Sequence, residues 1–296
     1  MSKRALIFVN RNARRGKKRL AQAVDILDNL GFELVLVPSK QSDELAQLIR
    51  RHKDELDLVI IGGGDGTLNR VVDVLVETQL PLGILPLGTA NDLARTLGLP
   101  QSVPEACRAI AQGNHRSIDL GWVNGKYFFN VASLGLSVKI TRRLSQGMKQ
   151  RWGILAYAIS AVQALTQLHP FQAEIQVDGQ VIVVKTLQIA VGNGRYYGGG
   201  MAIAEDAAID DQRLDLYSLE VKHWWQFIPL LWKMRRGQQA SLPWVRGLHG
   251  QEIAIRTREP HAINTDGEIT TATPATFRVI PQALTVLVAG SSGFRG

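Results

Sequence analysis

The sequence contains very little cysteine and no long hydrophobic run. Cys107 is the only cysteine among 296 residues, so an internal disulfide is impossible and CxxC-type zinc sites are excluded. The most apolar helical stretch, residues 153–168, is shorter than the roughly 20 residues of a membrane span. The first ten residues lack the apolar core and cleavage site of a signal peptide. These absences predict a soluble cytoplasmic protein that at most contacts a membrane surface.

Positive charge is in excess, with 34 Lys and Arg against 26 Asp and Glu and a net charge of +8. Such an excess suits a polyanionic partner, which could be a nucleic acid, an anionic membrane surface or a nucleotide. No RNA- or DNA-binding motif occurs, so we expect no nucleic-acid partner. The apolar content of 45% is typical of a globular chain long enough for one large or two ordinary domains.

Strands and helices alternate up to about residue 120. Four apolar segments read as strands, at residues 5–10, 32–37, 56–61 and 83–88. Between them lie a helix over 18–30, with Leu20, Val24, Leu27 and Leu30 on one stripe, and a helix that Ser42 would cap. Short apolar strands separated by amphipathic helices predict a parallel sheet covered on both faces. Ligands of such sheets bind beyond the carboxyl ends of the strands, where the loops after Val9, Ile61 and Leu85 meet.

The pattern changes after residue 120. Strands with short turns follow at residues 125–135, 173–194, 213–220, 252–257 and 275–290, and Asp178-Gly179 is a hairpin signal. Two helices interrupt them, at about 152–168 and 223–236. We therefore predict a nucleotide-binding α/β domain over 1–120 and a mostly antiparallel β-sandwich domain over 121–296. A return of the last strand to the first domain is compatible with the pattern.

A glycine-rich loop, "GGGDGTLN" (62–69), separates an apolar strand from a helical pattern. Backbone N–H groups and the positive end of a helix converge in such loops and bind phosphate. The loop is not a Walker A motif, because G-x-x-x-x-G-K-[ST] does not occur in the sequence, and it is not a dinucleotide fingerprint, because Thr67 stands where the third glycine should be. Asp65 would repel phosphate unless a divalent cation lay between them, which indicates Mg²⁺. The alternative is a tight turn with a capping Asp and with Thr67 capping a helix whose Val71, Val72, Leu75 and Val76 face the core.

A second loop of this kind, "LPLGTANDLAR" (85–95), carries Gly88 and Thr89 after the next strand and Asn91 and Asp92 at a helix start. Helix capping alone would explain the last two residues. Two such loops at one sheet edge could instead enclose a single nucleotide.

Six motifs occur in a particular order: "GGGDGTLN", "PLGTANDLAR", "IDLG" (118–121), "VGNGRYYGGG" (191–200), "AAIDDQRLDL" (207–216) and "NTDGE" (264–268). This set resembles the diacylglycerol kinase catalytic family, in particular its soluble bacterial lipid kinases, over essentially the whole chain. A GGDGT-type loop also occurs in NAD kinases, but the ordered set suits lipid kinases better.

The resemblance implies roles for residues at matching positions. Asp65, Asp92 and Asp119 would hold a catalytic Mg²⁺ through water, and Glu268 would be the general base. A second, structural Mg²⁺ would be held by Asp211 and the backbone carbonyls of Ala208 and Arg213. The expected ATP-binding residues are Asn10, Arg11, Asn12, Ala13, Arg14, Ser39, Gly64, Asp65, Gly66, Thr67, Leu68, Asn69, Arg70 and Thr89.

Several positions depart from the family pattern. Arg11 replaces a proline, Arg70 replaces a glutamate, and Glu205 and Gln212 replace a proline and a glycine of the metal segment. If the backbone at Gln212 needs a positive φ, the substitution strains it by about 1 kcal/mol or more. These last two departures bear directly on the second Mg²⁺ site.

Residues 221–237 combine Trp224, Trp225 and Trp232 with a cluster of Lys and Arg, a composition that suits an interfacial membrane helix. The alternative is a helix that packs Phe227, Leu230 and Leu231 into the β domain. Residues 142–152 form a second basic candidate.

The sequence favours an ATP- and Mg²⁺-dependent kinase that acts on a lipid hydroxyl at the inner membrane face, with diacylglycerol to phosphatidic acid as the leading reaction. Phosphatidylglycerol and a sphingoid base are alternative acceptors. A further alternative is a catalytically silent regulator that binds lipid or nucleotide. The altered residues 11–15, 70 and 212 favour this alternative. Retention of the three aspartates and Glu268 favours an enzyme. A homodimer is left open.

Overall fold

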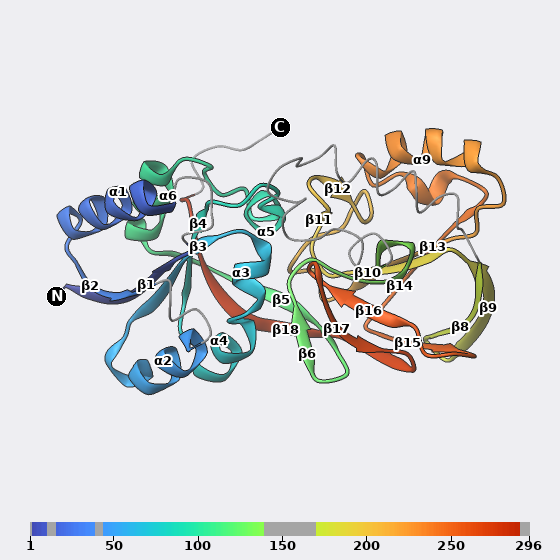
Figure 1. Ribbon diagram of the computed structural model, residues 1–296, viewed down its shortest axis with the longest axis horizontal. Helices are drawn as coiled ribbons and strands as arrows, with labels where there is room; N and C mark the ends of the chain where they lie inside the picture. Colours follow the sequence, from blue (N-terminus) through green and yellow to red (C-terminus); the bar gives the residue numbers. More distant parts are fainter. Residues whose placement is uncertain (1, 11–15, 39–43, 139–169, 291–296) are drawn as a thin grey trace. The chain divides into compact units, whose positions relative to one another are not determined.

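The computed structural model describes residues 2–10, 16–38, 44–138 and 170–290. The chain divides into two compact units (Figure 1). Unit 1 comprises residues 1–120, 198–200 and 280–296, and unit 2 comprises residues 121–197 and 201–279. Unit 1 therefore includes a glycine segment and the end of the last strand, both distant in sequence from its other residues.

Unit 1 is built on a parallel sheet with strand order β2-β1-β3-β4-β18. Val9 pairs with Gly62 and Gly63 pairs with Pro86, so β1, β3 and β4 end together at one edge. Every residue of β3 and β4 is buried, which confirms the parallel sheet predicted from their apolar runs. The strands are β1 (Lys3–Val9), β2 (Phe32–Val37), β3 (Leu58–Gly63), β4 (Leu82–Pro86) and β18 (Ala275–Val288).

Helices cover both faces of this sheet, with α1 and α6 on one side and α2 and α4 on the other (Figure 1). Leu27, Ile60 and Cys107 lie in the same core cluster. Burial raises the pKa of the Cys107 thiol to about 11, so the thiol is protonated and unreactive at neutral pH. The helices are α1 (Gly16–Asn29), α2 (Leu45–His52), α3 (Asp65–Asn69), α4 (Val72–Thr78), α5 (Asp92–Thr96) and α6 (Val103–Gln112).

Two details of the predicted helices are wrong. Helix α1 ends at Asn29, so Leu30 is 44% exposed and Ala23 contributes to the core instead. The helix expected after the glycine loop is divided into α3 and α4, and Thr67 lies inside α3 rather than capping it. Gly64 is the N-cap residue, and it has no side chain to offer. The predicted Ser42 cap lies outside the described residues.

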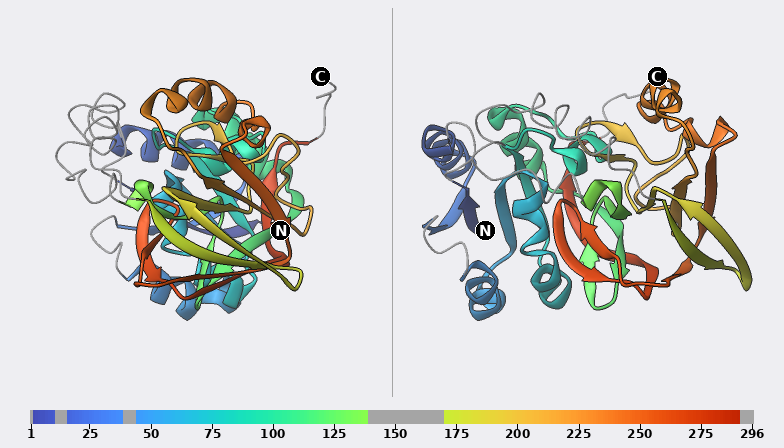
Figure 2. Two further views of the ribbon diagram at one scale, coloured as in Figure 1. Left: turned by 90° about the vertical axis from the view of Figure 1, so that its right-hand side faces the viewer. Right: turned by 45° about the vertical axis from the view of Figure 1, so that its right-hand side comes forward.

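Unit 2 is an antiparallel β-sandwich, as predicted (Figure 2). One layer has the order β14-β13-β10-β7-β16-β17, and the other contains β15, β8, β9 and the first part of β18. Leu134, Val191 and Leu216 of the first layer share a core with Ile175 and Phe277 of the second. The strands of the first layer are β7 (Val131–Gly135), β10 (Gln188–Gly192), β13 (Leu214–Leu219), β14 (Val245–Gly250), β16 (Ala262–Thr265) and β17 (Glu268–Ala272).

The second layer contains the predicted hairpin. Its strands β8 (Phe171–Val177) and β9 (Gln180–Thr186) are joined by Asp178 and Gly179 with φ of 48° and 77°. Strand β15 (Glu252–Thr257) pairs with β8 and with residues 275–278 of β18. The remaining strands are β5 (Asn114–Val123), β6 (Lys126–Phe128), β11 (Tyr196–Tyr197) and β12 (Met201–Ala202).

Helix α9 (Phe227–Met234) follows a single 3₁₀ turn, η3 (Trp224–Gln226), and lies on unit 2. Leu230 and Met234 of α9 pack against Tyr217 and Val245 on the face of the six-stranded layer opposite the sandwich core. The helix predicted over 223–236 is thus confirmed, whereas the one predicted over 152–168 lies outside the described residues. Over the ranges the structure describes, no helix is long and apolar enough to cross a membrane.

Candidate active site

The loops after β1 and β3 are tied together at the carboxyl edge of the sheet. The backbone N–H of Asn10 donates to the carbonyl of Gly62 at 2.9 Å. Its side-chain Nδ2 donates to Oγ1 of Thr67 in α3 at 3.3 Å. Asn10 therefore connects the predicted nucleotide loop of β1 to the glycine-rich turn, whereas Arg11 to Arg14 and Ser39 lie outside the described residues.

The loops after β3 and β4 meet through their glycines. The carbonyl of Gly63 accepts N–H groups from Leu87 and Gly88 at 3.0 and 3.2 Å. A Cβ atom added to Gly88 would lie 2.5 Å from the Cα of Gly64. Only residues without a side chain allow the two backbones to come this close, so these glycines have a structural reason that the sequence alone does not reveal.

Asp65 bridges the same two loops. Its Oδ2 accepts the backbone N–H of Asp92 at 3.1 Å and its Oδ1 accepts that of Leu93 at 3.0 Å. A carboxylate from one loop therefore caps the first turn of α5 in the next. Asn91, the residue preceding α5, turns back to accept the N–H of Gly88 at 2.8 Å. Asp65 thus caps a helix, as the capping alternative predicts. The helix is α5 in the next loop, however, and not the helix that directly follows the glycine-rich loop.

Asp92 lies beside Asp65 and is only 4% exposed. Its Oδ2 accepts the N–H of Gly199 at 2.9 Å, within a run of three glycines that all have positive φ. Its Oδ1 is buried and has no hydrogen-bond partner among the residues that the structure describes. Burial, with the negative charge of Asp65 adding to it, raises the pKa of Asp92 to about 6.

This acidic pair fits a divalent cation. A buried carboxylate oxygen without a partner is unfavourable unless a ligand or a proton reaches it. Mg²⁺ prefers one or two carboxylates together with water and phosphate oxygens, which is the donor set that Asp65 and Asp92 would provide. A bound cation would also remove the repulsion between the two carboxylates.

Asp119 lies on β5 and is 2% exposed. Its Oδ1 accepts the backbone N–H of Gln282 on β18 at 2.8 Å. Within the described ranges, no group of three acidic, His or Cys side chains gathers at distances suited to a metal, so Asp119 does not join the acidic pair in a direct cluster. Its predicted contact with Mg²⁺ through water stays a prediction.

Glu268 is the first residue of β17 and is exposed. It follows Asp266 and Gly267, whose φ values of 48° and 98° correspond to a two-residue hairpin turn of the I′ type. The Asp266 carboxylate accepts three backbone N–H groups, from Phe129 at 2.7 Å, Asn130 at 3.0 Å and Val131 at 3.1 Å. Asp266 therefore fixes the turn that presents Glu268.

The "VGNG" motif supports the same turn from the other side. Asn193 Nδ2 donates to the carbonyl of Phe129 at 3.0 Å, and the Gly194 N–H donates to that of Asn130 at 3.3 Å. Sequence analysis missed both this role and that of Asp266. The donors and acceptors lie from 64 to 137 positions apart in the chain, so no local pattern could reveal them.

The remaining predicted nucleotide residues occupy the same two loops. Gly64 precedes α3, and Asp65 to Asn69 form it. Arg70 is exposed at the end of α3, and Thr89 is exposed in the loop after β4. Their contacts with ATP stay predictions.

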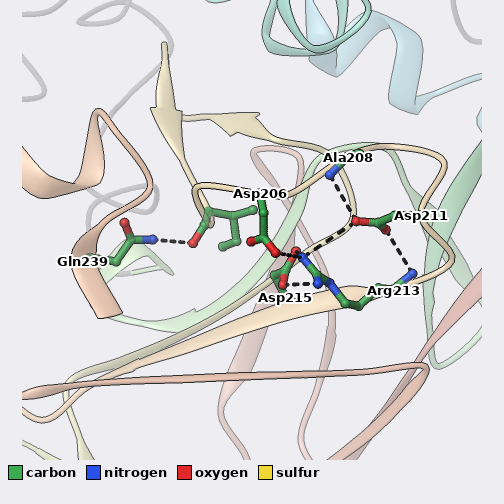
Figure 3. A network of polar contacts seen from close by, with 7 residues as sticks. Asp206, Ala208, Asp211, Arg213, Asp215 and Gln239 are labelled. Carbon is green, nitrogen blue, oxygen red and sulfur yellow. Dashed lines mark hydrogen bonds and ion pairs between the residues drawn. The ribbon is translucent and has the colours of Figure 1, made fainter. Parts of the chain in front are cut away.

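The segment predicted to hold a second Mg²⁺ has a different arrangement (Figure 3). The Asp211 carboxylate accepts the backbone N–H groups of Ala208 at 3.2 Å and Arg213 at 3.1 Å. The Arg213 guanidinium lies 3.1 Å from Asp206 Oδ2, 3.2 Å from Asp215 Oδ1 and 3.8 Å from Asp211 Oδ2. We call these three aspartates with Arg213 the Arg213 cluster.

Arg213 offsets part of the negative charge of the three aspartates, which weakens their attraction for a cation. The second Mg²⁺ site at Asp211 and the carbonyls of Ala208 and Arg213 stays a prediction. Gln212 has a φ of 57°, the left-handed conformation that a glycine would adopt without strain. Glu205, which replaces the family's proline, accepts a hydrogen bond from Gln238 at 2.9 Å.

A parallel α/β unit with joined glycine loops and an acidic pair, combined with a β-sandwich, defines the class of the protein. Residues 4–123 match the diacylglycerol kinase catalytic domain, and residues 130–288 match the YegS C-terminal NAD kinase beta sandwich-like domain. The chain therefore belongs to the diacylglycerol kinase family, in the branch that includes YegS-like bacterial lipid kinases.

Individual relatives resemble the chain over nearly its full length. It is 30% identical over 281 residues to the diacylglycerol kinase of Bacillus subtilis (strain 168), covering 93% of each chain. It is 32% identical to the probable lipid kinase YegS-like of Klebsiella pneumoniae (strain 342), covering 90% of each. A solved structure from Bacillus anthracis str. Sterne has a TM-score of 0.84 at 26% identity, covering 99% of this chain and 97% of the other.

The first prediction concerns the turn before Glu268. Asp266→Ala should lower the free energy of unfolding by about 2–4 kcal/mol, because three N–H groups lose a charged acceptor. Asp178→Ala is the matched control, since Asp178 has the same φ of 48° in the other hairpin. Urea unfolding measures both variants, and equal losses would contradict the anchoring role of Asp266.

The second prediction concerns Asp92 in metal-free protein. Its folded pKa of about 6 lies above the usual value for Asp, so its contribution to stability falls as the pH rises from about 4 to about 6. Asp92→Asn should remove a penalty of about 2–3 kcal/mol that is present at pH 7 and absent at pH 4. Urea unfolding with chelator at both pH values tests this, with Asp25→Asn on α1 as the control. A pH-independent difference between Asp92→Asn and wild type would refute it.

The third prediction concerns the Arg213 cluster, measured in the Asp92→Asn background so that the acidic pair binds no metal. Chelator should leave the melting temperature nearly unchanged, because Arg213 already offsets part of the negative charge of the three aspartates. Arg213→Met should lower the melting temperature and make it rise with added Mg²⁺, since three aspartates lose their counter-charge. Arg246→Met, which removes a pair with Glu220 alone, is the control. Loss of stability on chelation with Arg213 present would contradict this expectation and support the second Mg²⁺ site.

Proposed function

We propose that this protein transfers the γ-phosphate of ATP to a lipid hydroxyl, with diacylglycerol as the leading acceptor and phosphatidic acid as its product. The observation that carries this proposal is the Asp65–Asp92 pair at the edge where the glycine loops of β3 and β4 meet. Relatives named diacylglycerol kinase and probable lipid kinase support the reaction class.

Phosphoryl transfer asks the protein mainly for positioning and charge neutralisation. Gly64 and Gly88 keep side chains away from the loops, so phosphate groups can approach backbone N–H groups. Asp65 and Asp92 would hold Mg²⁺, which when bound would neutralise the charge of the phosphates. Because Asp65 is fixed by two N–H donors from α5, its carboxylate is oriented before any ligand arrives.

Glu268 is the proposed general base, which would take the proton from the lipid hydroxyl as the phosphate bond forms. Its exposure leaves the carboxylate accessible to a substrate. The three hydrogen bonds of Asp266 hold the preceding turn, so Glu268 starts from a fixed backbone position.

The burial of Asp92 favours an enzyme over a silent regulator. A chain that had lost its chemistry would gain stability by replacing a buried carboxylate of which one oxygen, Oδ1, has no hydrogen-bond partner among the described residues. The acceptor is less constrained, and phosphatidylglycerol or a sphingoid base would serve the same site. We expect the reaction to take place in the cytoplasm, at the inner face of the membrane that contains the lipid.

The fourth prediction tests the reaction directly. Labelled γ-phosphate of ATP is offered with diacylglycerol, phosphatidylglycerol and a sphingoid base in mixed micelles. Label should enter one lipid, preferably diacylglycerol, and Glu268→Gln should lower turnover at least about 10²-fold while ATP binding stays near normal.

Glu259→Gln, which changes another exposed glutamate of unit 2, is the control and should retain turnover. Near-normal turnover in Glu268→Gln would remove Glu268 from the mechanism. Absence of label in every lipid, with ATP still bound, would contradict the kinase proposal for these acceptors.

A further inference from the structure

One side of η3 and α9 presents large apolar side chains to solvent. Trp225, Ile228, Leu231 and Trp232 are 50%, 58%, 60% and 74% exposed. We call these four residues the apolar strip. Ile228, Leu231 and Trp232 are spaced i, i+3 and i+4, so they occupy one face of α9. Exposed apolar side chains gathered in this way indicate an interaction surface.

The apolar strip is not the face that attaches α9 to unit 2. Leu230 and Met234 are 1% and 7% exposed and pack against the six-stranded layer. Helix α9 is therefore apolar on two sides, and the side that carries Leu230 packs against the six-stranded layer. The alternative considered from the sequence, in which Leu231 packs into the β domain, is wrong for that residue.

Basic residues lie in the same segment as the apolar strip. Residues 221–238 contain Lys222, Lys233, Arg235 and Arg236 and no acidic residue. Arg235 and Arg236 are exposed at the end of α9. Glu220, which precedes the segment, is paired with Arg246 at 2.7 Å. Glu205 accepts a hydrogen bond from Gln238 at 2.9 Å, so the basic residues outnumber this one acidic neighbour at the border of the apolar strip.

Trp225 has defined ring neighbours. Its ring lies edge-on to Trp244 and stacks on His223, each at a centroid distance of 6.0 Å. Because these rings hold Trp225 in place, its exposed half can bind a partner with little further loss of side-chain conformational entropy. Indole rings are favoured where apolar and polar media meet, as at the headgroup level of a bilayer.

We propose that the apolar strip and its basic border form the surface through which this protein docks on an anionic bilayer. The charge decides between occupants, because a second copy of the chain would bring four like charges against this border, whereas acidic headgroups would complement it. The inference rests on the proposed function only because a lipid substrate gives the protein a bilayer to reach. Docking itself requires neither ATP nor turnover.

The fifth prediction is tested by co-sedimentation of the full chain with vesicles, without ATP or diacylglycerol. The vesicles contain phosphatidylcholine alone or phosphatidylcholine mixed with phosphatidylserine. Wild type should bind the mixed vesicles more tightly, and Leu231→Ser/Trp232→Ser should weaken that binding at least about tenfold. Arg235→Gln/Arg236→Gln should weaken it by a similar factor at low salt and by much less at high salt, where charges are screened.

Matched controls separate these effects from general loss of charge or apolar surface. Val181→Ser/Val183→Ser removes two apolar side chains of similar exposure from β9, and Arg256→Gln/Arg258→Gln removes two exposed positive charges elsewhere on unit 2. Both should bind as wild type does. Circular dichroism and ATP binding show whether each variant is folded.

Three outcomes would overturn the docking proposal. The first is that wild type and Leu231→Ser/Trp232→Ser bind vesicles equally well. The second is that wild type binds neutral and acidic vesicles equally well. The third is that wild type binds no vesicles but self-associates, and that Leu231→Ser/Trp232→Ser abolishes this self-association. Turnover with a water-soluble short-chain diacylglycerol is measured in parallel. Lost vesicle binding with retained turnover supports docking through the apolar strip, whereas absent turnover with normal vesicle binding counts against the kinase proposal alone.

Discussion

The carboxylate of Asp65 is the contact on which the rest of the site depends. It accepts two backbone N–H groups from the start of α5, and so joins the loop after β3 to the loop after β4. The contact is available only because Gly64 and Gly88 let the two backbones meet. It also brings Asp65 close to Asp92, whose pKa is raised to about 6 mainly by burial, with a smaller contribution from the negative charge of Asp65. Two carboxylates held together in this way would be stabilised by a cation between them.

Repulsion between neighbouring carboxylates arises both at the Asp65–Asp92 pair and in the Arg213 cluster, but the surroundings of the carboxylates differ. In unit 1, the buried Oδ1 of Asp92 has no hydrogen-bond partner within the described part of the chain, and a ligand or a proton would satisfy it. In unit 2, Arg213 lies among three aspartates and offsets part of their negative charge (Figure 3).

Sequence reasoning succeeded where the cause was local. Apolar runs fixed the strands of unit 1, and parallel strands place their following loops at one edge, so the neighbourhood of Asp65 and Asp92 could be predicted. The cap that Asp65 provides to α5 could not, because it joins residues of two separate loops. For the same reason, the three donors to Asp266 and the grouping of Asp206 and Asp215 around Arg213 could not be predicted, because these contacts depend on which chain segments meet in space.

The central claim is that Asp65 and Asp92 together bind the cation that accompanies the nucleotide. Calorimetric titration with a non-hydrolysable ATP analogue, with and without Mg²⁺, tests it most directly. For wild type and the exposed-site variant Asp25→Asn, Mg²⁺ should raise nucleotide affinity. For Asp65→Asn and for Asp92→Asn, that increase should shrink by at least about tenfold, which corresponds to about 1.4 kcal/mol of lost coupling. An undiminished Mg²⁺ effect in both variants would contradict the account.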